Sequence, residues 1–158
     1  WIYTPDENVP PTDMVTMTIA DSLGGSDTVN FIFNQTGEGP VTLQGTFLKD
    51  VIFATGYSDT LTGGASADQF VFTADSGNDT ITDFRPGQDT IDLVDDLPFT
   101  AGDQASFDDW LNSSGNVVEQ QGSTLITLGD DSILLSNVSR ASLQMNDFIL
   151  HPGGVVGN

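Results

Sequence analysis

The sequence contains no cysteine and very little positive charge. Its 158 residues include 3 Lys and Arg and 1 His against 23 Asp and Glu, so the formal net charge is −20 at pH 7. Without cysteine the chain has no disulfide bonds and no thiol chemistry. So negative a chain argues against nucleic acids and anionic membrane surfaces as partners. Neutralisation of its own charge is therefore the first requirement for folding.

Long apolar runs and catalytic motifs are also missing. No stretch approaches the roughly 20 apolar residues that a membrane span needs, so we expect no membrane insertion. The single histidine, His151, lies in the predicted tail, and there is no H-E-x-x-H, G-x-S-x-G or phosphate-binding loop. We predict no catalytic residue and no enzymatic activity. The chain begins at Trp1 without a leader, so we expect a fragment or processed product, with any active site of its parent protein upstream.

A short pattern occurs five times between Gly45 and Leu93. The copies are GTFLKDVIF (45–53), ATGYSDTLT (54–62), GGASADQFV (63–71), ADSGNDTIT (74–82) and FRPGQDTID (84–92). The sixth place is always aspartate, at Asp50, Asp59, Asp68, Asp79 and Asp89. Two places later the residue is always apolar, at Ile52, Leu61, Phe70, Ile81 and Ile91. Small residues before the aspartate favour a tight turn, and the alternation after it is typical of a short strand with one buried face.

Such units are expected to stack, because one turn and strand cannot bury its apolar residue alone. If successive strands lie on opposite walls of a flattened coil, every second turn stacks. One edge then carries Asp50, Asp68 and Asp89, and the other carries Asp59 and Asp79.

Stacked carboxylates repel one another, by roughly 4 kcal/mol for two charges about 4 Å apart at an effective dielectric near 20. The chain offers only Lys49, Arg85 and Arg140 as cationic side chains, too few for five sites. A hard divalent ion with oxygen ligands is the natural counter-charge. Calcium accepts the mixture of carboxylates and backbone carbonyls that Gly-rich turns provide.

The third copy, GGASADQFV, closely resembles the nonapeptide G-G-x-G-x-D-x-U-x of RTX proteins, which forms a calcium-binding parallel β-roll. The stretch from Leu61 to Leu93 also resembles the last β-roll turns of serralysin-type and other type I-secreted proteins. This resemblance places Asp59, Asp68, Asp79 and Asp89 on the calcium-ligating aspartate of the family.

We predict about two to three bound calcium ions. The predicted ligands are the carboxylates of Asp59, Asp68, Asp79 and Asp89, the turn residues Gly63, Ala65, Gly77 and Gly87, and Asp50 and Asp92 as further candidates. The fourth place, usually Gly, holds Leu48, Tyr57 or Ser66 in the first three copies, where a left-handed turn would be strained. Asp50 therefore either ligates calcium or has a structural role without binding metal. Asp75, Asp83 and Asp92 lie outside the repeated place and are either ordinary turn residues or ligands.

Two alternating segments precede the repeats and predict a β-hairpin. Residues 14–19 place Val15, Met17 and Ile19 on one side, residues 28–33 place Val29, Phe31 and Phe33 on one side, and residues 22–27 form the connection. Residues 1–36 resemble the end of a cadherin-like or immunoglobulin-like repeat, with Trp1, Tyr3, Thr4, Pro5, Asp6, Asp21, Gly24, Gly25 and Asp27 in the matching places. A generic hairpin is the alternative.

After Leu93 the repeat stops. Residues 106–112 place Phe107, Trp110 and Leu111 on one helical face, a core patch rather than a ligand platform, with Gly102 and Asp103 as the start of the helix. Three short strands follow as a meander, and Ser139 can cap a helical turn through residues 140–145. The ending N-D-F-I-L resembles the C-terminal segment that type I secretion systems recognise.

We therefore predict a mainly β fold, a short parallel β-roll of four or five half-turns preceded by an antiparallel β-hairpin and capped by a small β-meander with one short helix. The predicted divisions are 1–40, the tail of a cadherin-like repeat or a lead-in hairpin; 41–93, the calcium-binding β-roll; 94–150, the capping and secretion-signal region; and 151–158, a flexible tail.

The predicted function is a calcium-binding RTX module that folds outside the cell, as the C-terminal end of a large secreted or surface adhesin of a Gram-negative bacterium. We expect a monomer whose partners are calcium and the type I secretion machinery. One alternative is the same module at the end of a secreted protease, lipase or epimerase. Another is a constitutive carbohydrate- or surface-binding β-domain, which would fold without metal.

Overall fold

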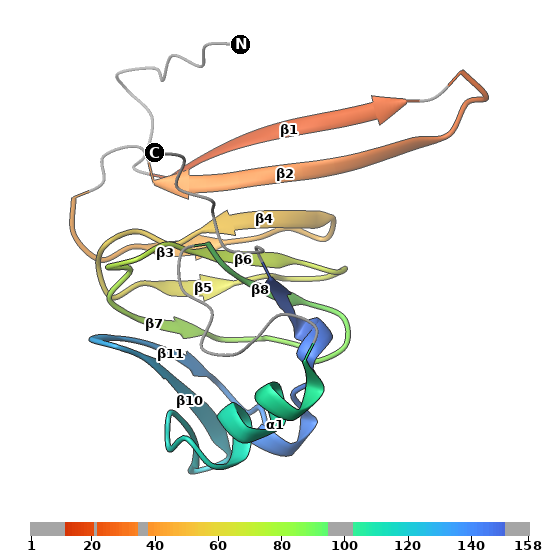
Figure 1. Cartoon of the computed structure of the whole chain (residues 1–158). Coiled ribbons are helices and arrows are strands. Elements are labelled where there is room, and N and C mark those ends of the chain that lie inside the picture. Colours follow the sequence, from red (N-terminus) through yellow and green to blue (C-terminus); the bar gives the residue numbers. More distant parts are fainter. Residues whose placement is uncertain (1–11, 21, 35–37, 95–102, 151–158) are drawn as a thin grey trace, which may run out of the picture.

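Two facing β-sheets wind together as a parallel β-roll in the computed structural model (Figure 1). The structure describes residues 12–20, 22–34, 38–94 and 103–150. The predicted features before Thr12, at Asp21, at residues 95–102 and in the tail with His151 lie outside the described residues. Among the described residues, no helix is both long and apolar enough to cross a membrane.

Strands from successive repeats alternate between the two sheets, as the stacking prediction requires. The first sheet has the order β1 (Thr12–Ala20), β2 (Ser26–Asn34), β4 (Lys49–Phe53), β6 (Gln69–Phe72), β8 (Thr90–Leu93) and β12 (Phe148–Leu150). The second has the order β3 (Thr42–Gln44), β5 (Thr60–Thr62), β7 (Asn78–Ile81), β11 (Asp131–Leu135), β10 (Ser123–Leu128) and β9 (Val117–Gln120). The predicted mainly β fold, with its roll, hairpin and meander, is confirmed.

The core between the sheets is built from the repeated apolar place. All five of these side chains have 0% of their surface exposed: Ile52, Leu61, Phe70, Ile81 and Ile91. They pair in parallel register within each sheet, Ile52 with Phe70 and Phe70 with Ile91 in the first, and Leu61 with Ile81 in the second. Each copy therefore buries its apolar residue against copies above and below it.

The hairpin of β1 and β2 extends the first sheet, because β2 pairs in parallel with β4. Figure 1 shows its long ribbon projecting beyond the roll. The face that enters the core carries Asn30 (2% exposed) and Ile32 (1%). The face that the sequence pattern singles out, with Val29 and Phe31, is therefore not the core face, since neighbouring residues of a strand point to opposite sides.

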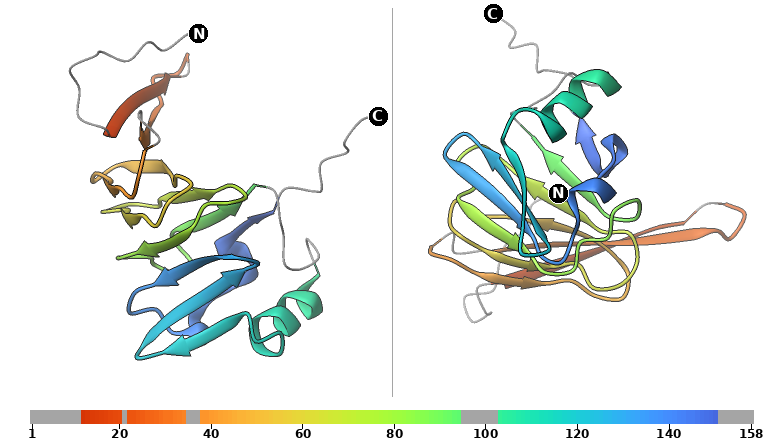
Figure 2. Two further views of the ribbon diagram at one scale, coloured as in Figure 1. Left: turned by 90° about the vertical axis from the view of Figure 1, so that its left-hand side faces the viewer. Right: turned by 90° about the horizontal axis from the view of Figure 1, so that it is seen from below.

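The C-terminal part closes the other end of both sheets. β11 pairs in parallel with β7, and β12 with β8, whereas β9, β10 and β11 form the predicted antiparallel meander. Figure 2 shows the layers in succession from the hairpin through the roll to the meander. Two segments far apart in sequence thus complete the roll.

The helix α1 (Gln104–Asn112) covers this end of the core. The side chain of Asp103 accepts hydrogen bonds from the backbone N–H groups of Ala105 and Ser106, which fixes the start of the helix. Trp110 packs edge-on against Phe148, with ring centroids 5.3 Å apart, and both are nearly buried. The predicted role of the helix as a core patch is confirmed.

The prediction of one helical turn over residues 140–145 is wrong. Two 3₁₀ turns replace it, η1 (Arg140–Ser142) and η2 (Met145–Asp147). Between them Leu143 is extended, with φ −74° and ψ 139°, and its side chain is buried in the core. Ser139 does not cap the turn, because its hydroxyl donates to Glu119 Oε2 at 2.9 Å.

Candidate metal centre

Aspartates of alternate repeats form a hydrogen-bonded ladder along one edge of the roll. The backbone N–H of Asp50 donates to Asp68 Oδ1 at 3.0 Å, and the N–H of Asp68 donates to Asp89 Oδ1 at 3.1 Å. We call the three turns, residues 45–50, 63–68 and 84–89, edge one. The predicted stacking of these three aspartates is confirmed.

A second ladder runs along the opposite side. The N–H of Asp59 donates to Asp79 Oδ1 at 2.8 Å, which confirms that these two aspartates stack. The N–H of Gly77 then donates to Asp131 Oδ1 at 3.0 Å. We call the turns at residues 54–59, 74–79 and 129–131 edge two. Asp131 lies in the meander, outside the repeat, so no spacing in the sequence pointed to it.

The second carboxylate oxygen divides the turns into two kinds. In three turns it accepts the backbone N–H four residues earlier, from Thr46 to Asp50 at 2.6 Å, from Thr55 to Asp59 at 2.7 Å, and from Arg85 to Asp89 at 2.8 Å. In the other two turns, those of Asp68 and Asp79, this bond is missing. Oδ2 of both residues is buried without a hydrogen-bond partner among the described residues.

Backbone conformation accompanies this difference. The residue four positions before Asp68 is Gly64, with φ +94°, and the residue four positions before Asp79 is Asp75, with φ +61°. Both are left-handed, and the N–H of Gly64 donates instead to Asp83 Oδ2 at 2.8 Å. The turns with left-handed second residues thus leave one aspartate oxygen without a hydrogen bond.

Burial disfavours the ionised form of these carboxylates, because it removes them from water. Asp68 and Asp79 are 1% and 2% exposed, and burial raises the pKa of each from 3.8 to about 7. Burial also raises the pKa of the Asp89 carboxyl. A cation beside Oδ2 of Asp79 would replace the lost hydration and restore the ionised form.

Two of the predicted ligands, Asp50 and Asp92, do not carry a buried oxygen of this kind. Both oxygens of Asp50 are used inside the protein, Oδ2 by the Thr46 N–H and Oδ1 by Asn30 Nδ2 at 2.8 Å. Asp92 lies in β8 rather than in a turn, and its Oδ2 accepts a hydrogen bond from Gln69 Nε2 at 2.8 Å. The structure does not bring Asp92 into either ladder.

The four turn residues predicted as ligands lie where expected along the edges. The N–H groups of all four are engaged. Gly63 donates to Asp83 Oδ1 at 2.8 Å, Ala65 to the Thr46 carbonyl at 2.9 Å, and Gly77 to Asp131 Oδ1 at 3.0 Å. The N–H of Gly87 donates to Asp147 Oδ1 at 2.7 Å. Metal ligation by their carbonyls stays a prediction.

The strain expected at the fourth place occurs in one turn only. Ser66 is left-handed, with φ +76°, and its hydroxyl donates to the Phe47 carbonyl of the neighbouring turn at 3.0 Å. Leu48 and Tyr57 have no positive φ, so the expectation of strain there is wrong. These two turns take a path that a bulky side chain tolerates.

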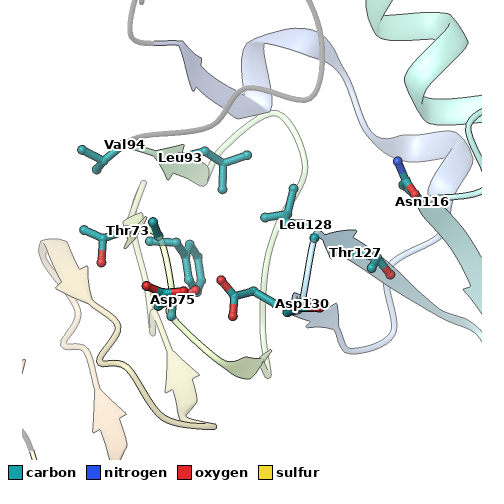
Figure 3. Close-up of a pocket in the computed structure, with 13 residues that line it drawn as sticks. Thr73, Asp75, Leu93, Val94, Asn116, Thr127, Leu128 and Asp130 are labelled. Atoms are coloured by element: carbon teal, nitrogen blue, oxygen red, sulfur yellow. The ribbon is translucent and has the colours of Figure 1, made fainter. Parts of the chain in front are cut away.

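A pocket of about 400 Å³ opens beside edge two (Figure 3). It lies between residues 72–76 and residues 127–131, and in Figure 3 the carboxylate of Asp130 is turned toward Asp75. Among the described residues, no three acidic, histidine or cysteine side chains gather closely enough to hold a metal by themselves. A metal shell on this edge must therefore include backbone oxygens.

The donor set suits calcium. Edge two offers the unpartnered Oδ2 of Asp79 and backbone carbonyls such as that of Tyr57, whose oxygen lies 2.9 Å from the position of a Cβ on Gly77. Hard oxygen donors with flexible geometry are what calcium prefers. The site residues fit this ion.

Stacked aspartate turns on two facing parallel sheets define the RTX-type β-roll class. The family model described as "Peptidase M10 serralysin C terminal" matches residues 7–155, and the chain belongs to this family. Its β-rolls generally bind calcium, and homologous domains belong to secreted extracellular proteins of Gram-negative bacteria exported by type I secretion.

One solved structure supports the fold, and a second is similar in sequence. The extracellular lipase LipA from Serratia marcescens is similar with a TM-score of 0.51 and 14% identity, over 87% of this chain and 26% of the lipase chain. The chain thus spans about a quarter of that protein's length. The AlgE6R3 subunit of the Azotobacter vinelandii mannuronan C5-epimerase matches with 20% identity and a TM-score of 0.31, over 90% of this chain and 93% of the subunit. No curated protein matches the chain.

Proposed function

We propose that the chain is a non-catalytic, calcium-dependent folding module at the C-terminal end of a larger secreted protein. The buried Oδ2 of Asp79 is the observation that carries the proposal, because it has no hydrogen-bond partner among the described residues and its pKa is raised to about 7. A calcium ion at edge two would take its ligands from Oδ2 of Asp79 together with backbone carbonyls of the stacked turns. Bound calcium supplies the positive charge that these carboxylates lack.

Calcium would act as a switch on folding. In scarce calcium the net charge of −20 and the buried carboxylates oppose the compact state. Extracellular calcium sites have Kd values of order 10⁻⁴–10⁻³ M. Calcium at 100-fold above Kd adds about 2.7 kcal/mol per site. Two or three ions would therefore contribute about as much as the entire stability of a small domain.

Export and folding are mutually exclusive on this scheme. The segment that resembles the type I secretion signal includes Phe148, which pairs with Ile91 in the first sheet and is 4% exposed. A transporter can read this segment only before β12 joins the roll. We propose that low calcium inside the cell keeps the segment available, and that calcium outside the cell hides it.

The parent protein is either an adhesin or a secreted enzyme. The adhesin reading rests on the resemblance of residues 1–36 to a cadherin-like repeat, and most of the matching places, including Trp1, Tyr3 and Asp6, lie outside the described residues. The secreted-enzyme reading agrees with the family description, which names a peptidase. The sequence encoded before Trp1 in the parent gene would separate the two.

The test is a calcium titration of the chain, followed by far-UV circular dichroism, with magnesium as the metal control. We expect β-structure to form with calcium at sub-millimolar to millimolar concentrations and not with magnesium. A chain already fully folded in chelator would contradict the proposal and favour the constitutive binding domain.

The matched pair Asp79→Asn and Asp109→Asn locates the site. Asp79→Asn should lower the number of bound calcium ions and the stability in calcium, while raising stability in chelator because it removes a buried charge. Asp109 is exposed on α1, so Asp109→Asn should change neither quantity. Equilibrium dialysis gives the number of ions, and urea denaturation gives the stability.

A further inference from the structure

One cationic side chain lies between two stacked turns of edge one. The guanidinium of Arg85 donates from Nη2 to the carbonyl of Gly64. Its Nη2 lies 3.8 Å from Asp68 Oδ2, the unpartnered oxygen of that turn, and its Nε lies 3.5 Å from Asp89 Oδ2. The guanidinium thus faces a carbonyl and a carboxylate of one turn and the carboxylate of the next.

A second side chain of the same turn completes the arrangement. Gln88 Nε2 donates to the carbonyl of Ser66 at 2.7 Å. Two carbonyls and one carboxylate of residues 63–68 therefore receive positive charge or N–H groups from residues 84–89. These oxygens are of the same kinds that form a calcium shell in a Gly-rich turn.

Edge two has no equivalent. Residues 54–59, 74–79 and 129–131 contain neither Lys nor Arg. Both ion pairs found among the described residues are made by Arg85. Arg140 donates to the Val117 carbonyl near the meander instead. The Oδ2 atoms of Asp68 and Asp79 therefore differ in one respect, since only that of Asp68 faces a cationic side chain.

We propose that Arg85 is a built-in cation that takes the place of one calcium ion between residues 63–68 and residues 84–89. The inference rests on the proposed calcium function and refines it. The turns at residues 63–68 and 84–89 are therefore held together by protein groups alone, whereas the turns of edge two require a metal ion. The guanidinium suits this position because it is always charged and carries five donors in a fixed plane. The chain should bind fewer calcium ions than it has stacked aspartate pairs.

The experiment counts calcium ions per chain by equilibrium dialysis for the wild type, Arg85→Gln and the control Arg140→Ala. Arg85→Gln removes the charge and keeps a hydrogen-bond donor. We expect it to bind one more calcium ion than the wild type, to be less stable in chelator, and to regain wild-type stability in saturating calcium. Arg140→Ala should leave the number of ions unchanged. An Arg85→Gln chain that folds in calcium with the wild-type number of ions overturns the inference.

A second pair of variants decides the question if Arg85→Gln does not fold. Asp68→Asn should leave the number of bound ions unchanged, since Arg85 already serves Asp68, whereas Asp79→Asn should lower it. Loss of one ion in Asp68→Asn overturns the inference.

The proposed function fails separately, when the wild type binds no calcium at all. In that case, one calcium ion bound by Arg85→Gln still supports the role of Arg85. If Arg85→Gln also binds no calcium, the role of Arg85 is contradicted.

Discussion

At the scale of single residues, the glycines of the turns have two separable roles. Gly77 and Gly87 are both left-handed, with φ +85° and +77°. A Cβ at Gly77 would lie 2.9 Å from the Tyr57 carbonyl oxygen of the neighbouring turn, whereas a Cβ at Gly87 would meet nothing within 4 Å. One glycine therefore provides conformational freedom together with close packing of turn on turn, and the other provides conformational freedom alone.

We expect Gly87→Ala to lower the free energy of unfolding by about 1–2 kcal/mol, the cost of a left-handed alanine. Gly77→Ala should cost at least about 1 kcal/mol more, because the neighbouring turn must move as well. Urea denaturation of both variants in saturating calcium measures the difference. Equal losses would show that the turns of edge two do not pack closely.

The raised pKa values of Asp68 and Asp79 predict an unusual dependence on pH. The folded chain holds protons up to about pH 7 that the unfolded chain, with a pKa of 3.8, has released. The contribution of these two groups to stability is therefore largest below about pH 4 and is lost as the pH rises through 7. In chelator we expect greater resistance to urea at about pH 5.5 than at about pH 8.

Calcium should reverse this trend, because it competes with protons for the carboxylate of Asp79. Its apparent affinity should increase between about pH 5.5 and about pH 8. The double variant Asp68→Asn with Asp79→Asn should flatten the dependence in chelator. Higher metal-free stability at about pH 8 in the wild type would contradict the assignment.

At the scale of elements, the last strand and the helix stabilise one another. Phe148 of β12 packs against Phe107 and Trp110 of α1, with ring centroids 5.9 and 5.3 Å away. We expect Phe148→Ala to cost about 3–5 kcal/mol, as for other large-to-small changes in a core. Phe47→Ala is the matched control, since Phe47 is 77% exposed and should be nearly neutral. Thermal unfolding in calcium compares the two, and equal melting temperatures would refute a structural role for β12.

The repeated part of the roll was predictable from sequence because its signal is local. An aspartate followed two places later by an apolar residue marks each turn and strand, so the alternation of strands and the stacking of the five repeat aspartates followed from the spacing. The pairing of β11 with β7 and of β12 with β8 did not, since these partners lie more than fifty residues apart and follow no period. Asp131 and Asp147 were missed for the same reason.

The role of Arg85 was also missed. The sequence shows that basic residues are too few to serve five aspartates, but not that one of them serves two. Only the geometry places its guanidinium near Asp68 Oδ2 and Asp89 Oδ2. The core face of β2 escaped prediction because both of its faces carry apolar residues, Ile32 on one and Phe31 on the other.

For the whole molecule, the net charge predicts a marked effect of ionic strength. In chelator we expect NaCl at about 0.5 M to stabilise any folded population relative to about 0.05 M, because the shorter Debye length screens the repulsion among the carboxylates. In saturating calcium the effect should be smaller, since the buried charges are then neutralised at short range. Urea midpoints at both salt concentrations measure it. An equal salt effect with and without calcium would contradict neutralisation by bound metal.

The position of β11 and β12 so far along the sequence has a consequence for closure of the roll. The edges of β7 and β8 stay unpaired until residues 131–135 and 148–150 join them, so the two sheets cannot close on a chain that lacks these residues. Until then the chain exposes two unpaired strand edges beside apolar residues, and long-range pairing of this kind is slow. A chain truncated before residue 131 cannot complete its sheets, which makes closure of the roll a check that residues 131–150 are present.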